Sequence, residues 1–329
     1  MFVLNHYNNT KFPLHLLYTP LYVLFTHHHI VFFYILKQTR MQLQLRKFDI
    51  SSISHDKVII LLGKRGTGKS ILVRDILYNN RDIPVGSIVS PTEQSNHFYS
   101  DMVPHIFIHD ELTPDIISKV IQRQLKQNKS IEKQKKVYGS SSIDSRMFLI
   151  LDDCMFDSSW THDKGIRYLF MNGRHLPLML LITMQHPLGI PPSLRTNVDF
   201  VFILRENVVS NRKKIWVNYA GMFPTFDAFC QVMDQCTEDY ECLVINNNVQ
   251  SNKLEDQVFW YKAGIHDNFK IGSREVWDLA RRTKPAKCSW GGDDDNSDYD
   301  SEDEPAFDAK ALLQGKKNTV PISVRKSIY

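Results

Sequence analysis

The order of apolar positions along this chain predicts buried strands that alternate with helices. Continuous apolar runs of strand length occur at residues 58–62, 87–89, 106–108, 147–151, 178–183 and 200–204. A run that is apolar at every position indicates a strand buried on both faces, whereas the spacing at residues 71–77 indicates a helix. The alternation predicts an α/β fold with a mostly parallel sheet and helices on both faces.

Two later regions indicate that the same core continues. Residues 226–237 have helical spacing, and residues 241–245 and 257–261 read as strands. Earlier, Thr113, Pro114 and Asp115 form a helix start, and the helix that follows is strongly basic. Its bases are Lys119, Arg123, Lys126, Lys129, Lys133, Lys135 and Lys136. This basic insertion, about residues 113–146, is either an arm that contacts a phosphate backbone or a solvated surface helix.

Residues 63–70 match the phosphate-binding pattern G-x-x-x-x-G-K-[ST] at every fixed position. They are Gly63, Lys64, Arg65, Gly66, Thr67, Gly68, Lys69 and Ser70. A buried strand precedes them and a helix follows, which is the context that this motif requires. We therefore predict ATP and Mg²⁺ as cofactors, with Lys69 at the β- and γ-phosphates and Ser70 on the metal.

A second motif lies at the end of the apolar run 147–151, where Asp152 and Asp153 follow. A carboxylate at the end of a neighbouring strand suits Mg²⁺, so Asp152 is the predicted metal ligand. Asp153 is the predicted base for the attacking water. Most motor ATPases that have such a phosphate loop carry glutamate at the position of Asp153. Glutamate is longer than aspartate by one methylene. The alternative for the pair is an ordinary polar turn.

The apolar run 178–183 leads to Gln185. If this strand lies between the two motif strands, its end lies beside the γ-phosphate, and Gln185 is then the predicted sensor. The alternative is an ordinary amide at a strand end.

Composition allows one large α/β domain with additions, or two small domains, since the chain has 329 residues and 43% of them are hydrophobic. Five cysteines, an odd number without a C-x-x-C pair, argue against a disulfide framework or a zinc site. A reducing compartment is the simplest inference.

Charge is segregated along the chain. Residues 293–304 contain eight acids and no base, so removing them from a chain of net charge +4 leaves +12. The remainder suits a polyanionic partner. We expect the acidic block, and the tail 286–329 around it, to be disordered. The block is either a solvated tail or a competitor of DNA for the basic surface.

The first forty residues differ from the rest. Residues 13–36 approach the hydropathy of a membrane span, but Pro20 and four histidines interrupt them. A soluble opening begins at Met41, which we take as the real start. We therefore expect no stable membrane span in the mature protein.

Taken together, the motifs resemble the poxvirus-type genome-packaging ATPases of nucleocytoplasmic large DNA viruses, within the FtsK/HerA superfamily of DNA-pumping motors. The resemblance covers roughly residues 41–280. Besides the phosphate loop, it rests on residues 151–154 (LDDC) with Trp160, 173–175 (GRH), 185–187 (QHP), 191–199 (PPSLRTNVD), 218–223 (NYAGMF) and 259–263 (FWYKA). Two consecutive aspartates are usual in that family.

The resemblance implies a homo-oligomeric ring, a hexamer or pentamer, that surrounds duplex DNA and hydrolyses ATP to fill a preformed capsid. It implies capsid or portal-site proteins as partners, and the host cytoplasm, the viral factory or the virion as the location. In such rings a neighbour supplies an arginine finger. Arg195 is the candidate here and Arg174 the second. Either could instead bind DNA or a core carboxylate.

Three other functions share some of these motifs. A helicase or recombination ATPase shares nearly all of them. A small-molecule kinase shares the phosphate loop but does not need a polar sensor. A structural protein with a relic site is disfavoured by the intact Lys69, Ser70, Asp152 and Gln185.

Overall fold

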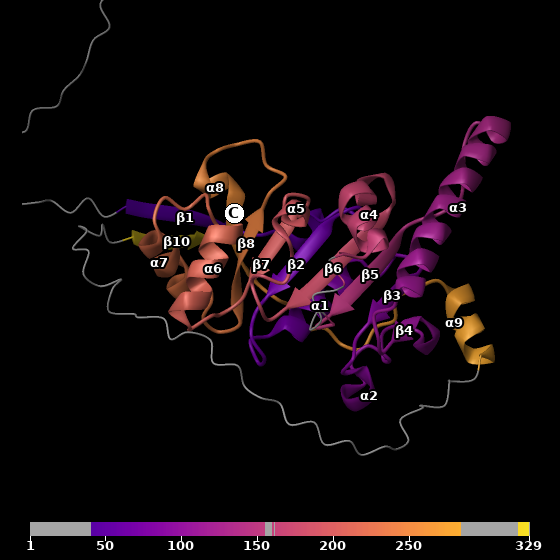
Figure 1. Cartoon of the computed structure of the whole chain (residues 1–329), viewed down its shortest axis with the longest axis horizontal. Helices are drawn as coiled ribbons and strands as arrows, with labels where there is room; N and C mark the ends of the chain where they lie inside the picture. The colour runs from indigo at the N-terminus through magenta and orange to yellow at the C-terminus, as the bar shows by residue number, and fades with distance from the viewer. Residues whose placement is uncertain (1–40, 155–159, 161, 284–321, 329) are drawn as a thin grey trace, which may run out of the picture. The chain divides into compact units, whose positions relative to one another are not determined.

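The computed structural model describes residues 41–154, 160, 162–283 and 322–328 (Figure 1). The predictions for residues 1–40, for a start at Met41 and for the acidic block 293–304 concern segments outside the described residues. The described residues belong to one compact unit, which contains every element described below. No helix within the described ranges is both long enough and apolar enough to cross a membrane.

The described strands form one sheet in the order β10-β1-β9-β8-β7-β2-β6-β5-β3-β4. Their bounds are β1 Met41–Lys47, β2 Val58–Leu62, β3 Gly86–Val89, β4 Ile108–His109, β5 Met147–Asp152, β6 Leu178–Met184, β7 Phe200–Ile203, β8 Glu241–Asn246, β9 Val258–Lys262 and β10 Ile322–Ser327. Neighbours pair in parallel except where β8 meets β7 and β9. The predicted mostly parallel sheet is confirmed.

Helices lie on both faces of the sheet (Figure 1). They are α1 Lys69–Asn79, α2 Glu93–Asn96, α3 Pro114–Tyr138, α4 Lys164–Asn172, α5 Pro192–Arg195, α6 Val209–Tyr219, α7 Phe226–Cys236, α8 Leu254–Gln257 and α9 Arg274–Arg282. Alternate residues of β2 enter two separate cores. Ile60 and Leu62 belong to the core under α3, α4 and α7, and Ile59 and Leu61 to the core under α1. Burial on both faces explains the unbroken apolar runs.

The expected order at the centre of the sheet is present. β6 lies between β2 and β5, with Leu62 opposite Met184 and Asp152 opposite Thr183. Because these strands are parallel, their carboxyl ends share one edge of the sheet. β8 runs the opposite way and therefore begins at that edge. We call it the carboxyl edge, and the other the amino edge.

The predicted strand at residues 106–108 is wrong in part. A 3-10 helix, His105–Phe107, occupies most of it, and β4 is only Ile108–His109. Pro104 precedes this turn, and β4 is the last strand of the sheet, where a short strand suffices.

The opposite end of the sheet corrects the prediction for the tail. Ile322–Ser327 is not disordered: it forms β10, which pairs in parallel with β1 from Met41 to Arg46. The Val324 N–H donates to Gln235 of α7 at 2.9 Å, and Lys326 pairs with Glu241. This strand forms because β1 offers it a partner far away in sequence, which composition alone does not reveal.

Candidate nucleotide-binding site

The phosphate loop, residues 63–68, leaves the carboxyl end of β2 and enters α1. Gly66 and Gly68 have φ of 78° and 97°, a region that L side chains rarely adopt. At Gly63 the restriction is space, because an added Cβ would lie 2.9 Å from Cβ of Leu204. The Thr67 hydroxyl closes the loop by donating to the Lys64 carbonyl at 2.7 Å. The glycines of the motif therefore serve the fold of the loop itself.

Lys69 lies in the first turn of α1 and its ammonium turns back into the loop. It donates to the carbonyls of Gly63, at 2.6 Å, and Lys64, at 3.1 Å. Burial lowers the pKa of Lys69, and the charges of Asp153 and Asp152 offset part of that effect. The two aspartates are thus close enough to act on this ammonium, which places both motifs at one site.

Thr183 holds the two aspartates in place. Its hydroxyl donates to Oδ1 of Asp152 at 2.6 Å and accepts from the backbone N–H of Asp153 at 3.0 Å. Thr183 is fully buried within β6, so solvent does not compete for these bonds.

Asp153 is held from a second direction by Gln185, whose side-chain amide donates to Oδ2. Asp153 has φ of 51°, a left-handed conformation that is uncommon for residues other than glycine. Such a conformation at a strand end next to a phosphate loop is typical of functional sites. Gln185 therefore lies where the sensor was predicted, in contact with the predicted base.

The donor set fits Mg²⁺. The Ser70 hydroxyl and the Asp152 carboxylate are hard oxygen ligands, at the first turn of α1 and the end of β5. The Tyr99 hydroxyl is buried beside Asp152, and its burial and the charge of that carboxylate raise the pKa of Tyr99.

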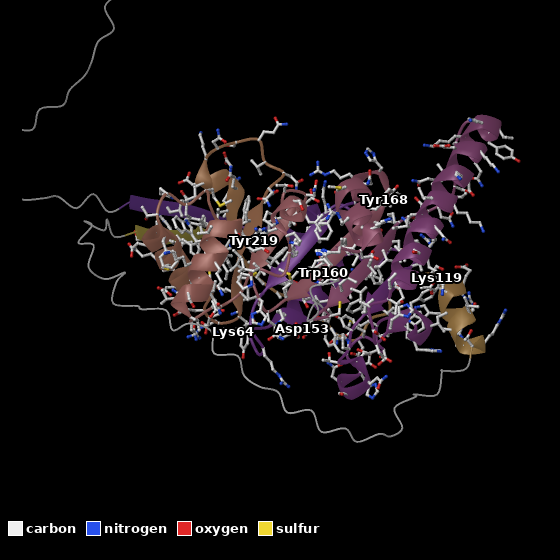
Figure 2. The ribbon with its side chains drawn as sticks, in the orientation of Figure 1. Lys64, Lys119, Asp153, Trp160, Tyr168 and Tyr219 are labelled. Atoms are coloured by element: carbon white, nitrogen blue, oxygen red, sulfur yellow. The ribbon has the colours of Figure 1, made fainter. Side chains whose placement is uncertain are left out.

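Lys64 reaches out of the loop to a buried carboxylate beyond β7. Its ammonium lies 2.8 Å from Oε1 of Glu206. The same carboxylate accepts from the Val208 N–H at 2.8 Å and from Asn211 at 3.1 Å. Figure 2 shows Lys64 and Asp153 along the same edge of the sheet. Arg65 is exposed.

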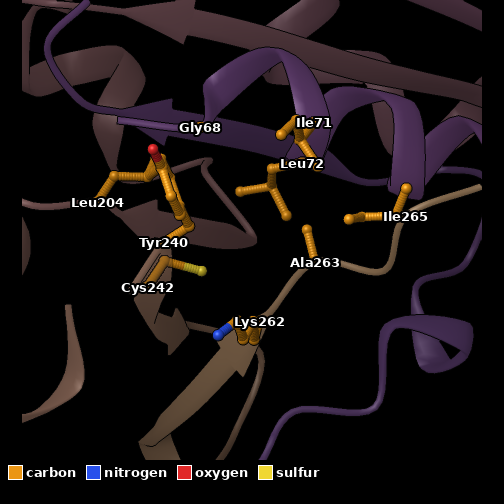
Figure 3. Close-up of a pocket in the computed structure, with 9 residues that line it drawn as sticks. All are labelled: Gly68, Ile71, Leu72, Leu204, Tyr240, Cys242, Lys262, Ala263 and Ile265. Atoms are coloured by element: carbon orange, nitrogen blue, oxygen red, sulfur yellow. The ribbon is translucent and has the colours of Figure 1, made fainter. Parts of the chain in front are cut away.

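A small apolar pocket of about 100 Å³ opens beside the loop (Figure 3). It lies between the first turns of α1 and the ends of β7, β8 and β9. Its lining is Gly68, Ile71, Leu72, Leu204, Tyr240, Cys242, Lys262, Ala263 and Ile265. Tyr240 precedes β8, has φ of 62° and leaves 65% of its surface exposed. An exposed ring at the mouth of an apolar pocket suits a flat aromatic ligand.

Arg195 and Arg174 do not lie at this chain's own phosphate loop. Arg195 ends α5, which leads into the amino end of β7, and its guanidinium lies 5.6 Å from the Tyr219 ring. Arg174 pairs at 3.3 Å with Asp199, whose other oxygen accepts from the Val58 N–H. Both arginines are therefore at the amino edge, and Arg174 holds a core carboxylate, which was one of the alternatives for it.

Sequence reasoning missed Thr183, Glu206 and Tyr240. Thr183 had a signal, since it is the one polar residue in the run from Leu178 to Met184. No sequence motif indicated a role for Glu206 or Tyr240. Tyr240 reaches the loop only because β8 is antiparallel.

Curated proteins of large DNA viruses are similar to this chain. Uncharacterized protein L437 of Acanthamoeba polyphaga mimivirus is 40% identical over 241 residues, which are 73% of this chain and 84% of that protein. Uncharacterized protein 075L of Invertebrate iridescent virus 6 is 40% identical over 74% of this chain and 92% of that protein. Uncharacterized protein 015R of Frog virus 3 is 34% identical over 68% of this chain and 67% of that protein.

The chain belongs to the family of these proteins of nucleocytoplasmic large DNA viruses. No protein-family model matches the chain.

Solved structures of similar fold include the genome packaging NTPase B204 from Sulfolobus turreted icosahedral virus 2 in complex with AMPPCP. It is 16% identical over 65% of this chain and all of that one, with a TM-score of 0.44. The pCW3 conjugation coupling protein TcpA with ATPγS is 16% identical over 65% of this chain and 62% of that one, with a TM-score of 0.45. The strand order and the phosphate loop of this family member themselves show its fold.

Proposed function

We propose that this protein is an ATP-driven translocase of double-stranded DNA that moves a viral genome into a preformed capsid. The main support for the proposal is the set of hydrogen bonds beside the phosphate loop that joins Thr183, Asp152, Asp153 and Gln185. A chain that only binds nucleotide needs the loop but not a hydrogen-bond network that fixes two carboxylates and an amide. The family supplies the context of a large DNA virus.

Each group at the carboxyl edge has a role in the proposed reaction. The loop N–H groups and Lys69 hold the phosphates, and Ser70 and Asp152 hold Mg²⁺, which supplies charge neutralisation of the triphosphate. Asp153, oriented by Gln185, accepts a hydrogen bond from the attacking water and takes its proton as the water oxygen bonds to the terminal phosphorus. The bond from that phosphorus to the β–γ bridging oxygen breaks, and ADP leaves with that oxygen.

The direction of the nucleotide follows from the sheet. The carboxylates lie on the β5 and β6 side of the loop, so the terminal phosphate points there. The base then points the other way, toward the β7, β8 and β9 side, where the apolar pocket lies (Figure 3). Stacking on Tyr240 would hold the adenine.

The proposed assembly is a homo-oligomeric ring, a hexamer or pentamer, around the duplex. Because Arg195 lies at the amino edge, it serves as the finger only if it reaches a neighbour's terminal phosphate. Capsid or portal-site proteins would dock the ring, in the host cytoplasm, the viral factory or the virion.

Steady-state ATP hydrolysis by the full chain, with and without long duplex DNA, tests the proposal. We expect duplex to stimulate hydrolysis severalfold, and Lys69→Ala to abolish it. Equal rates with and without duplex would contradict a duplex motor. Stimulation by single strands alone would favour a helicase or recombination ATPase instead.

A further inference from the structure

Helix α3 is anchored to the sheet along its first half only. Ile116, Ile117 and Val120 are buried in the core. Gln124 donates to the carbonyls of Ser145, at 3.1 Å, and Pro177, at 3.0 Å. The last such bond joins Asn128 to the His175 carbonyl at 3.2 Å. Beyond it the helix continues for ten residues, to Tyr138, and extends away from the sheet (Figure 1).

We call residues 126–138 the basic arm. Five of its residues are lysines and one, Glu132, is an acid. Four of the lysines, Lys126, Lys129, Lys133 and Lys136, are separated by three, four and three positions, which places them on one face of a helix. All four are exposed at the helix surface. No carboxylate of the described residues forms an ion pair with them, whereas Lys119, nearer the start of the helix, pairs with Asp115.

The lysine face is directed away from the body of the protein. At 100° per residue, it is nearly opposite the face formed by Ile117, Val120 and Gln124, which packs on the sheet. The segment that returns to β5 runs along the packed side, since the Ser141 hydroxyl donates to Oε1 of Gln134 at 2.7 Å. The arm therefore has one face bound to its own chain and one face of lysines in solvent.

Lysines at three- and four-residue spacing repel one another and destabilise the helix that carries them. A polyanion reverses this effect. The stripe from Lys126 to Lys136 is about 15 Å long at the ordinary helical rise. Duplex DNA presents about one phosphate charge per 1.7 Å of its axis, so a face of this length meets several phosphates.

We propose that the lysine face of the basic arm is a contact to the phosphate backbone of duplex DNA. The inference rests on the proposed function and adds a surface to it. The arm contacts phosphates without reading bases, as a motor that moves any sequence requires. Residues 139–146 connect the arm to the amino end of β5, the strand that ends at Asp152.

The test compares three forms of the full chain. The first is Lys129→Ala/Lys133→Ala/Lys136→Ala, and alanine preserves the helix because it has the highest helix propensity. The second replaces the same three lysines by arginine, which keeps the charge. The third is a matched control away from the arm, Lys214→Ala/Lys253→Ala/Lys270→Ala, which removes three surface lysines. Circular dichroism reports helix content in each.

The measurement is binding to a random-sequence 30-base-pair duplex by fluorescence anisotropy over a salt series. We expect the alanine form to bind at least tenfold more weakly than wild type at low salt. The slope of log affinity against log salt should fall by about 2 to 3, because each phosphate that the protein neutralises contributes about 0.9 to that slope. The arginine form should bind like wild type, and the control should keep the wild-type slope.

Two results separate the failure of this inference from that of the function. If the wild-type chain binds duplex and the alanine form binds it with the same affinity and the same salt dependence, the arm contact alone is overturned. A wild-type chain that does not bind duplex at any salt would overturn both. Loss of binding in the arginine form as well would also contradict a charge contact, and would point to a protein partner on this face.

Discussion

The Thr183 hydroxyl donates to Oδ1 of Asp152 across the junction of β6 and β5, at 2.6 Å, while it accepts from the Asp153 N–H. One buried side chain thus fixes the carboxylate that would hold the metal and the backbone of the residue that would activate water. A hydrogen bond to a metal ligand from a residue that does not itself bind the metal orients that ligand and tunes its basicity.

Thr183→Val should preserve the fold and ATP binding but lower kcat about 10- to 100-fold, because Asp152 and Asp153 lose their common anchor. The apparent Mg²⁺ requirement should rise as well. Hydrolysis measured across a Mg²⁺ titration, with ATP binding measured separately, checks both effects. Thr183→Ser, which keeps the hydroxyl, should retain most activity; equal loss in the serine variant would mean that packing, not the hydroxyl, matters.

Gln185→Ala should reduce kcat with little change in ATP affinity, since Gln185 contacts Asp153 rather than the loop. If the two residues act as a unit, Asp153→Asn and Gln185→Ala should be far from additive in a double-mutant cycle on kcat. Additive losses would show that the amide and the carboxylate act separately.

The centre of this sheet could be predicted from sequence because its determinants are local. Residues 58–62, 147–151 and 178–182 are apolar at every position, and the polar residues that follow them fall at one edge. The phosphate loop, Asp152, Asp153 and Gln185 were predicted on that basis, and the structure brings them together.

The periphery could not be predicted because its determinants lie far apart in sequence. β10 needs the free edge of β1, and Tyr240 reaches the loop only through the reversal of β8. The position of Arg195 at the amino edge follows from the connection between β6 and β7. Its role as a finger depends on a neighbouring subunit and stays a prediction.

Tyr240→Ala should weaken ATP binding about tenfold, because stacking of a base on an aromatic ring contributes about 1–3 kcal/mol. Binding of inorganic tripolyphosphate, which has no base, should not change. Calorimetric titration with both ligands separates the two effects. Tyr240→Phe keeps the ring and should bind ATP like wild type. An equal loss for tripolyphosphate would show that Tyr240 supports the loop and not the base.

Acid should weaken the fold through Glu206. Burial raises the pKa of this carboxyl, but hydrogen bonds from Lys64, Val208 and Asn211 outweigh it, and the net shift is downward. Because the pKa of Glu206 is lower in the folded protein than its unfolded value near 4.5, the ionised carboxylate stabilises the fold at pH values above 4.5. That stability is lost as the pH falls through the pKa of Glu206 in the folded protein.

Glu206→Gln should therefore show a smaller loss of stability than wild type between about pH 5 and pH 3. Lys64→Ala should cost about 1 kcal/mol at pH 7, because it removes a charged partner from a buried carboxylate. Urea unfolding at about pH 7, 5 and 3 measures both. Parallel pH profiles for wild type and Glu206→Gln would exclude this carboxyl as a source of acid sensitivity.

Displacement of a triplex-forming strand from duplex DNA tests translocation most directly, since it reports movement along a duplex without strand separation. The account predicts that ATP drives displacement by wild type, with a lag that grows with the length of duplex before the triplex, and that Lys69→Ala displaces nothing. ATP hydrolysis without displacement, or displacement only together with separation of the duplex strands, would contradict it.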